Sequence, residues 1–107
     1  MFEDWIDPFD PPLRRVVDPP APVLVDLATA IPTGNDRPFG RNRIAMRIKA
    51  GGLVVTGQTP GQLHAWARAA DGTWLGLVEF VLTTGNQRGT LPVRQWCPAK
   101  ALRPTWR

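Results

Sequence analysis

The side chains that could carry out covalent chemistry are few in this sequence of 107 residues. There is one cysteine, Cys97, one histidine, His64, and no serine, which removes every Ser-His-Asp mechanism. Cys97 and His64 could in principle act as nucleophile and base, but no acidic residue lies near enough in sequence to suggest an orienting third member. Because Cys97 precedes a proline in an apolar ending, we expect a buried structural thiol.

The sequence also has few residues that could bind a metal ion or form a catalytic pair of carboxylates. One histidine and one cysteine cannot make a zinc site with recognisable spacing, and the glycines form neither a GxGxxG motif nor a P-loop. After residue 36 the only acidic residues are Asp71 and Glu79, and Asp71 belongs to a turn signal, so no paired-carboxylate mechanism fits. We therefore expect a protein that is not an enzyme, with no cofactor, no metal and no small-molecule substrate.

Arginine and tryptophan are better represented, and both favour binding. Arginine makes bidentate contacts to phosphate, and tryptophan stacks on bases and is enriched in interface hot spots. A solvated charged face would explain the same arginine spacing, and Trp66 could be covered within the fold. The binding interpretation predicts a nucleic-acid surface made of Arg41, Arg43, Arg47, Lys49, Trp66, Arg68, Arg88 and Arg94.

The N-terminal segment is a second candidate for binding. Six prolines fall within residues 1–22, a density that disfavours a helix interior or a central strand and predicts an extended arm. The arm is either a solvated tail or a short linear motif that docks its apolar side chains on a larger partner. The docking residues would be Phe2, Trp5, Ile6 and Phe9, which alternate with acidic residues.

Charge is divided unevenly along the chain. Residues 1–36 hold seven acidic and two basic residues, a net charge of −5, whereas residues 37–107 hold eleven basic and two acidic residues, a net charge of +9. A basic body attracts nucleic acid, acidic protein or anionic lipid. A tethered acidic arm should rest on that body part of the time, with Trp5 or Phe9 covering the surface around Trp66.

The element that positions most of these residues is a predicted β-hairpin over residues 62–82. Asp71-Gly72 is a favoured two-residue turn between two apolar runs. With that turn, His64 faces Glu79 on a mixed face, as a surface pair worth a fraction of a kcal/mol. The other face is apolar and pairs Ala69 with Trp74, Ala67 with Gly76, Ala65 with Val78 and Leu63 with Phe80.

Shorter elements surround the hairpin. Alternation predicts strands over residues 43–49, with one basic face, and 53–56, while residues 23–31 fit a short strand or two helical turns. Pro92 makes a strand over residues 90–96 an edge strand, and Pro98 begins a helical turn before a last strand near Leu102. The expected core is Leu53, Val55, Leu63, Trp74, Val78, Phe80, Val93 and Leu102.

The strand count, the Asp71-Gly72 hairpin and the ending Trp96-x-Pro98-Ala99-x-x-Leu102 resemble a small SH3-like barrel, an architecture that Tudor-type modules share. The resemblance implies a mainly β fold with five to six strands over residues 39–107, preceded by an acidic, proline-rich arm over residues 1–38. The chain has no tyrosine, the residue that normally lines an SH3 peptide groove, so proline-peptide binding is not among the expectations.

Together these features predict a non-enzymatic binding module that contacts nucleic acid through a basic strand face and an exposed tryptophan. The alternative is a protein-interaction adaptor or accessory subunit that docks on a larger partner through its arm. A single cysteine, no signal-peptide pattern and no apolar span favour the cytoplasm and no membrane partner. The arginine-rich composition is typical of a GC-rich bacterial or phage genome, and the oligomeric state stays open.

Overall fold

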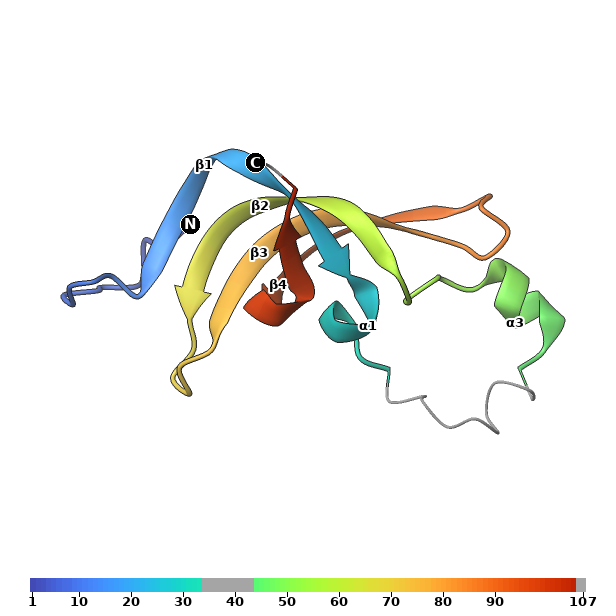
Figure 1. Ribbon diagram of the computed structural model, residues 1–107, viewed down its shortest axis with the longest axis horizontal. Helices are drawn as coiled ribbons and strands as arrows, with labels where there is room; N and C mark the ends of the chain where they lie inside the picture. Colours follow the sequence, from blue (N-terminus) through green and yellow to red (C-terminus); the bar gives the residue numbers. More distant parts are fainter. Residues whose placement is uncertain (34–43, 106–107) are drawn as a thin grey trace.

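Five antiparallel strands form one curled sheet, a half-barrel, in the order β4-β3-β2-β1-β5 (Figure 1). The computed structural model describes residues 1–33 and 44–105. The mainly β fold expected from the sequence is confirmed. The strands are β1 (Arg14–Asp26), β2 (Gln58–Arg68), β3 (Trp74–Thr83), β4 (Thr90–Pro98) and β5 (Leu102–Pro104), and the short helices are α1 (Leu27–Ala30), α3 (Met46–Gly51) and the 3-10 turn η1 (Ala99–Ala101).

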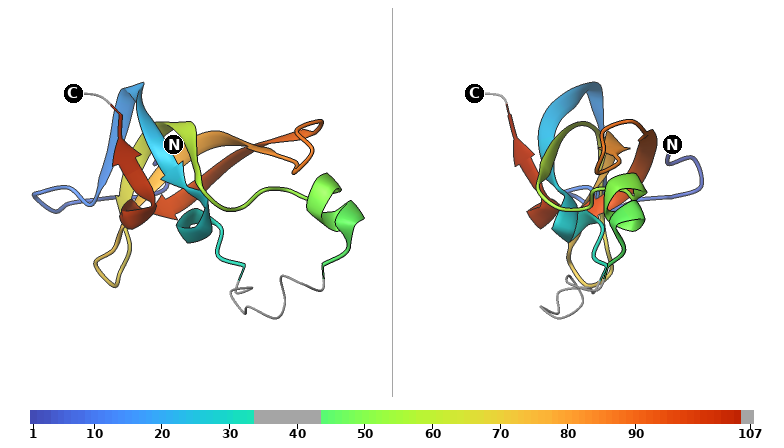
Figure 2. Two further views of the ribbon diagram at one scale, coloured as in Figure 1. Left: turned by 45° about the vertical axis from the view of Figure 1, so that its right-hand side comes forward. Right: turned by 90° about the vertical axis from the view of Figure 1, so that its right-hand side faces the viewer.

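The C-terminal part of the chain joins the two edges of the sheet. β4 lies at one edge, β5 at the other beside β1, and η1 carries the chain between them (Figure 2). The predicted edge strand, helical turn and last short strand are therefore confirmed. Within the described ranges, no helix has the length and apolar character needed to cross a membrane.

β2 and β3 form the predicted hairpin, but the predicted register is wrong. The connection is a five-residue loop over residues 69–73, closed by a hydrogen bond from the Ala69 amide to the Thr73 carbonyl at 2.8 Å. Asp71 accepts the Thr73 amide, and Gly72 has a φ of 93°. Ala67 consequently faces Leu75 rather than Gly76, and an irregularity between Leu63 and Ala65 shifts the pairing once more.

β1 is longer than the short strand expected near residues 23–31, and it lies between β2 and β5. The prediction of an arm over residues 1–22 is therefore wrong for residues 14–22. The sheet tolerates the prolines because pairing with β2 is interrupted between Val16 and Ala21, where Pro19 and Pro20 lie. Within residues 23–31 both open alternatives occur, since the strand ends at Asp26 and α1 follows.

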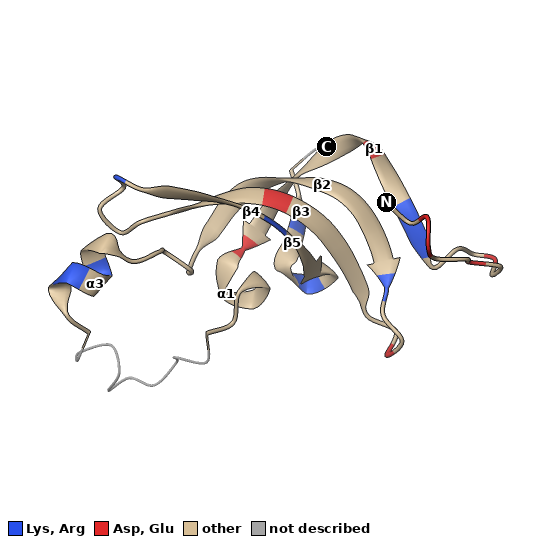
Figure 3. Ribbon diagram, turned by 180° about the vertical axis from the view of Figure 1, so that it is seen from behind, with Lys and Arg blue, Asp and Glu red and all other residues tan. Residues whose placement is uncertain are grey.

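Residues 46–51 form the helix α3 and not the predicted basic strand (Figure 3). The amides of Ile48 and Lys49 both donate to the Ala45 carbonyl, so this stretch satisfies its backbone locally and not along a sheet edge. Arg41 and Arg43 lie outside the described residues. The predicted strand over residues 53–56 is reduced to one bridge between Leu53 and Thr84.

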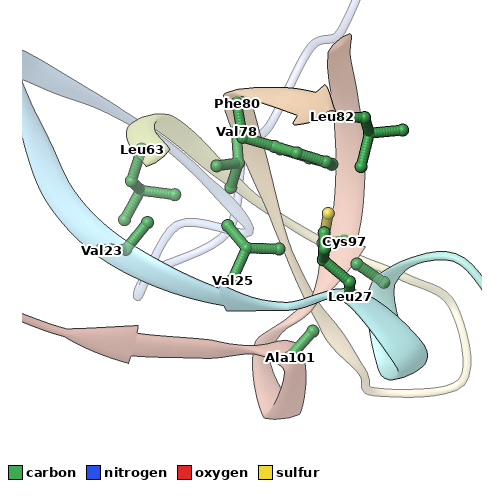
Figure 4. Packing of buried hydrophobic residues seen from close by; sticks show 10 residues of the cluster. Val23, Val25, Leu27, Leu63, Val78, Phe80, Leu82, Cys97 and Ala101 are labelled. Carbon is green, nitrogen blue, oxygen red and sulfur yellow. The ribbon is translucent and has the colours of Figure 1, made fainter. Parts of the chain in front are cut away.

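The core fills the concave side of the sheet. Side chains from β1, β2, β3, β4 and η1 point toward one another there (Figure 4). Leu63, Val78 and Phe80 are buried as predicted, and Val93 and Leu102 pack at the margin. Leu53 is 43% exposed, and Trp74 and Val55 are only half-buried, so these three predictions are wrong. The buried cluster is Val23, Val25, Leu27, Ala30, Leu63, Val78, Phe80, Leu82, Cys97 and Ala101.

Candidate functional site

A groove of about 470 Å³ opens between Trp66 and Trp74. Trp66 lies near the end of β2, Trp74 is the first residue of β3, and Ala99 is the first residue of η1. The groove is lined by Pro11, Pro12, Arg15, Trp66, Trp74 and Ala99. Its lining is largely apolar, with one cationic side chain and no acidic one.

Trp66 owes its position to a glycine on the neighbouring strand. It pairs with Gly76, where an added Cβ would lie 3.3 Å from the indole and 2.7 Å from Leu102 Cδ1. The indole packs partly on the core and partly lines the groove. Trp66 is therefore partly covered within the fold, and its contact with a partner stays a prediction.

The guanidinium group of Arg68 lies over the ring of Trp74. Arg68 Cζ lies 5.4 Å from the ring centroid, and Arg68 Nε donates to the Gly72 carbonyl at 3.1 Å. A cation over an indole face is attracted by the ring quadrupole, which orients both side chains. Arg15 within the groove and Arg68 beside it therefore place two positive charges around an aromatic surface.

The first residues of the chain pack on the other face of the sheet. Phe2 lies edge-on to Trp5 with ring centroids 5.5 Å apart, and it approaches Trp96 at 6.2 Å. Arg14 donates two hydrogen bonds to the Trp5 carbonyl, at 3.1 and 2.8 Å, and lies over both rings. A second hollow is lined here by Met1, Phe2, Asp4, Trp5, Ala67, Arg68, Leu75 and Trp96.

Only two of the four predicted docking residues of the arm pack on the sheet. Phe2 and Trp5 contact the sheet, whereas Ile6 and Phe9 are 89% and 65% exposed. The surface around Trp66 is approached by Pro11 and Pro12 and not by Trp5 or Phe9 as expected.

The predicted nucleic-acid residues do not share one face. Arg47 and Lys49 lie on α3, and Arg88 lies in the turn between β3 and β4. Trp66 and Arg68 lie at the other end of the β2–β3 hairpin, separated from that turn by the ten residues of β3, about 30 Å. Arg94 Nη1 lies on β4, 3.1 Å from Glu79 Oε1.

Glu79 also contacts His64, as predicted, although Gln62 and not His64 is its register partner. His64 Nε2 lies 2.8 Å from Glu79 Oε1, yet this buried nitrogen makes no hydrogen bond, so the contact is close but poorly directed. Such a pair contributes a fraction of a kcal/mol.

Cys97 is a free, fully buried cysteine. Burial raises the pKa of its thiol, with a smaller opposing effect from Gln95. The expectation of a buried thiol is confirmed. In residues 1–33 and 44–105 no three His, Cys, Asp or Glu side chains gather in a group that could hold a metal ion.

Five lining residues of the groove were missed by sequence reasoning: Pro11, Pro12, Arg15, Ala99 and Trp74, the last of which was assigned to the core. The Pro11-Pro12 pair was read only as a feature of an arm, because its position beside Trp66 depends on β1 entering the sheet. No local sequence signal marks Arg15, because its place in the groove depends on the same pairing of β1 with β2.

The fold and the groove define a small, mainly β domain built on a curled half-barrel of five strands. Comparisons of the chain with protein-family models, with curated proteins and with solved structures found no match.

Proposed function

We propose that this chain is a non-enzymatic protein-interaction module that holds an extended, proline-containing peptide in the Trp66–Trp74 groove. The observation that carries the proposal is an aromatic groove that already has Pro11 and Pro12 of the same chain in its lining. Indole faces and proline rings offer each other flat apolar surfaces, and an extended proline-rich segment loses little entropy on binding.

Charge further defines the ligand. Arg15 lines the groove, the Arg68 guanidinium lies on Trp74, and none of the lining residues is acidic. A peptide with an acidic side chain next to its prolines would meet a guanidinium group on either side of the aromatic surface. The preferred ligand is therefore an acidic, proline-containing segment.

The arrangement of the strands supports an SH3-like module. β5 lies beside β1, and a single 3-10 turn leads into β5, as in the barrels that the C-terminal sequence resembles. The tyrosines of an SH3 groove are absent, and Trp66 and Trp74 supply the aromatic surface in their place. The proposal therefore goes beyond the sequence analysis, in which a chain without tyrosine was not expected to bind a proline peptide.

Single-stranded nucleic acid is a second candidate ligand for the same groove. It is favoured by one observation, the indole of Trp74 beneath the guanidinium of Arg68, because stacking on an aromatic ring beside a cation is how many proteins hold unpaired bases. Arg47, Lys49 and Arg88 lie too far away to extend this platform.

The test is a calorimetric titration with an acidic proline-rich peptide, a copy with its prolines replaced by alanine, and oligothymidylate. We expect the first peptide alone to bind, with affinity at least about tenfold lower for Trp74→Ala. Trp96→Ala, which removes an indole from the other face, is the control and should bind normally. Peptide affinity unchanged by Trp74→Ala would refute the groove, and binding of oligothymidylate alone would establish the second candidate.

A further inference from the structure

The end of the molecule formed by α3 exposes apolar and basic side chains together. Met46 is 77% exposed, Ile48 53% and Leu53 43%, and Arg47, Lys49 and Arg88 lie among them. We call these six residues the basic end. No acidic residue occurs in residues 44–57 or 83–92, so its charge is uncompensated within these described stretches.

The basic end is held to the sheet by backbone hydrogen bonds. The Asn86 amide donates to the Ala50 carbonyl at 2.8 Å, and the Gly85 amide donates to the Gly52 carbonyl at 3.0 Å. The Val54 amide donates to the Thr83 carbonyl at 2.8 Å. These contacts tie α3 to the turn between β3 and β4, so Arg88 and α3 lie at the same end of the molecule.

The first thirteen residues form a surface of the opposite charge. Residues 1–13 contain four acidic residues and no lysine or arginine. Ile6 and Phe9 are the most exposed large apolar side chains of this segment, at 89% and 65%, followed by Met1 at 50%. We call residues 1–13 the acidic end. It is fixed to the sheet through Arg14, which donates to the Trp5 carbonyl, and through the Leu13 carbonyl, which accepts the Arg68 amide at 2.8 Å.

The two surfaces lie at opposite ends of an elongated molecule. The molecule measures 52 × 29 × 28 Å, and the acidic end and α3 occupy the two extremes of its long axis (Figures 1 and 3). In this arrangement they cannot contact each other within one chain. In place of the predicted contact with the basic face, this segment approaches Trp96 through Phe2 and lines one hollow together with Ala67.

We propose that the basic end binds the acidic end of a second copy of this chain, head to tail. The two ends are complementary in two respects. The carboxylates of the acidic end would pair with Arg47, Lys49 and Arg88. Its Ile6 and Phe9 would pack on Met46 and Ile48. A nucleic acid would satisfy the cations alone and leave the apolar side chains in water. Such a contact joins two different surfaces, so it generates open chains or rings and not a closed dimer.

The acidic end adjoins the Trp66–Trp74 groove through Pro11 and Pro12. The proposed contact uses Asp4, Ile6, Phe9 and Asp10, which do not line the groove, so this inference and the proposed function can fail separately. Sedimentation velocity of the full chain at rising concentration, in 20 mM and 500 mM salt, is the first measurement. We expect species larger than the monomer at low salt and their loss at high salt, because ions screen exposed charges.

Two neutralised variants test the direction of assembly. Asp4→Asn/Asp10→Asn weakens the acidic end, and Arg47→Gln/Lys49→Gln weakens the basic end; Asp7 is kept because it holds the chain turn. Each variant alone should stay monomeric. A mixture of the two should form a 1:1 dimer that grows no further, since each partner retains one intact end.

Asp18→Asn and Arg103→Gln alter exposed charges elsewhere and should assemble like the unmodified chain. A monomer under all conditions, or assembly unaffected by either double variant, would overturn the proposal. Binding of oligonucleotides or anionic vesicles that depends on Arg47 and Lys49, with the chain remaining monomeric, would also overturn it and assign the basic end to a polyanion.

Discussion

Trp66 on β2 lies directly opposite Gly76 on β3, and the absence of a side chain at Gly76 gives the indole its place at the margin of the core. A Cβ at Gly76 would lie 2.7 Å from Leu102 Cδ1 and 2.9 Å from Leu63 Cδ1. The pair connects the core to the groove, because the same indole contacts both.

Gly76→Ala should therefore destabilise the fold by about 1–3 kcal/mol, the usual cost of overpacking a filled core. It should also change the groove, since relief of the clash displaces Leu102, Leu63 or Trp66. Urea unfolding followed by circular dichroism measures the first effect. Gly51→Ala is the matched control, because nothing lies within 4 Å of its new Cβ, and its effect should stay within about 0.5 kcal/mol.

Phe80→Ala should cost about 3–5 kcal/mol, since this ring is only 4% exposed and lies in the central cluster. Trp74→Ala should cost clearly less, because Trp74 is half-buried at the start of β3 and its ring faces the groove and Arg68. Thermal unfolding of the two variants side by side checks the order. Equal losses would contradict the assignment of Trp74 to a surface groove.

Arg14→Lys should loosen the first thirteen residues while leaving the sheet intact. Lysine keeps the charge but loses the planar fork that donates twice to the Trp5 carbonyl and lies over Phe2. Hydrogen exchange should accelerate at the Trp5 amide, which donates to the Phe2 carbonyl. Arg15→Lys, one residue on, should leave exchange in this segment unchanged; faster exchange there as well would argue against a specific role for Arg14.

Stability should fall at alkaline pH through Cys97. Burial raises the pKa of its thiol in the folded state above the ordinary value of about 8.5, so the unfolded chain ionises first as pH rises. The contribution of the neutral thiol to folding stability is fully present below the unfolded-state pKa, and it is lost as the pH rises through the folded-state pKa. Urea unfolding between pH 7 and 10 should show a steeper loss for the unmodified chain than for Cys97→Ala. Parallel pH profiles would exclude Cys97 as the cause.

Local sequence signals were sufficient to predict the elements whose backbone hydrogen bonds are made, or omitted, within a few residues. The loop containing Asp71 and Gly72, the edge position of β4 with Pro92, and the 3-10 turn after Pro98 all follow from residues within a few positions of each other. The burial of Cys97 followed in the same way from the apolar ending around it. These features depend on turn chemistry and on a missing amide donor, which are properties of single residues.

The register of the hairpin could not be obtained in this way. A two-residue turn at Asp71-Gly72 and the five-residue loop that forms use the same residues. The loop shifts the pairs from Ala67 to Ala65 by one position, so Trp66 lies opposite Gly76 and not Leu77. The structure adds an irregularity between Leu63 and Ala65, which shifts the pairs beyond it by one further position. Trp66, Trp74 and Ala99 therefore share a groove that the sequence did not predict.

What the sequence by itself determined is the mainly β character, the central hairpin and the opposite charges of its two parts. Only the tertiary structure decided that residues 14–22 become a strand and residues 46–51 a helix, against their local patterns. A strand exists only if a neighbour accepts its hydrogen bonds. β1 has β2 and β5 on its two sides, which stabilise it despite its prolines, whereas Ile48 and Lys49 find their acceptor in Ala45, one helical turn away.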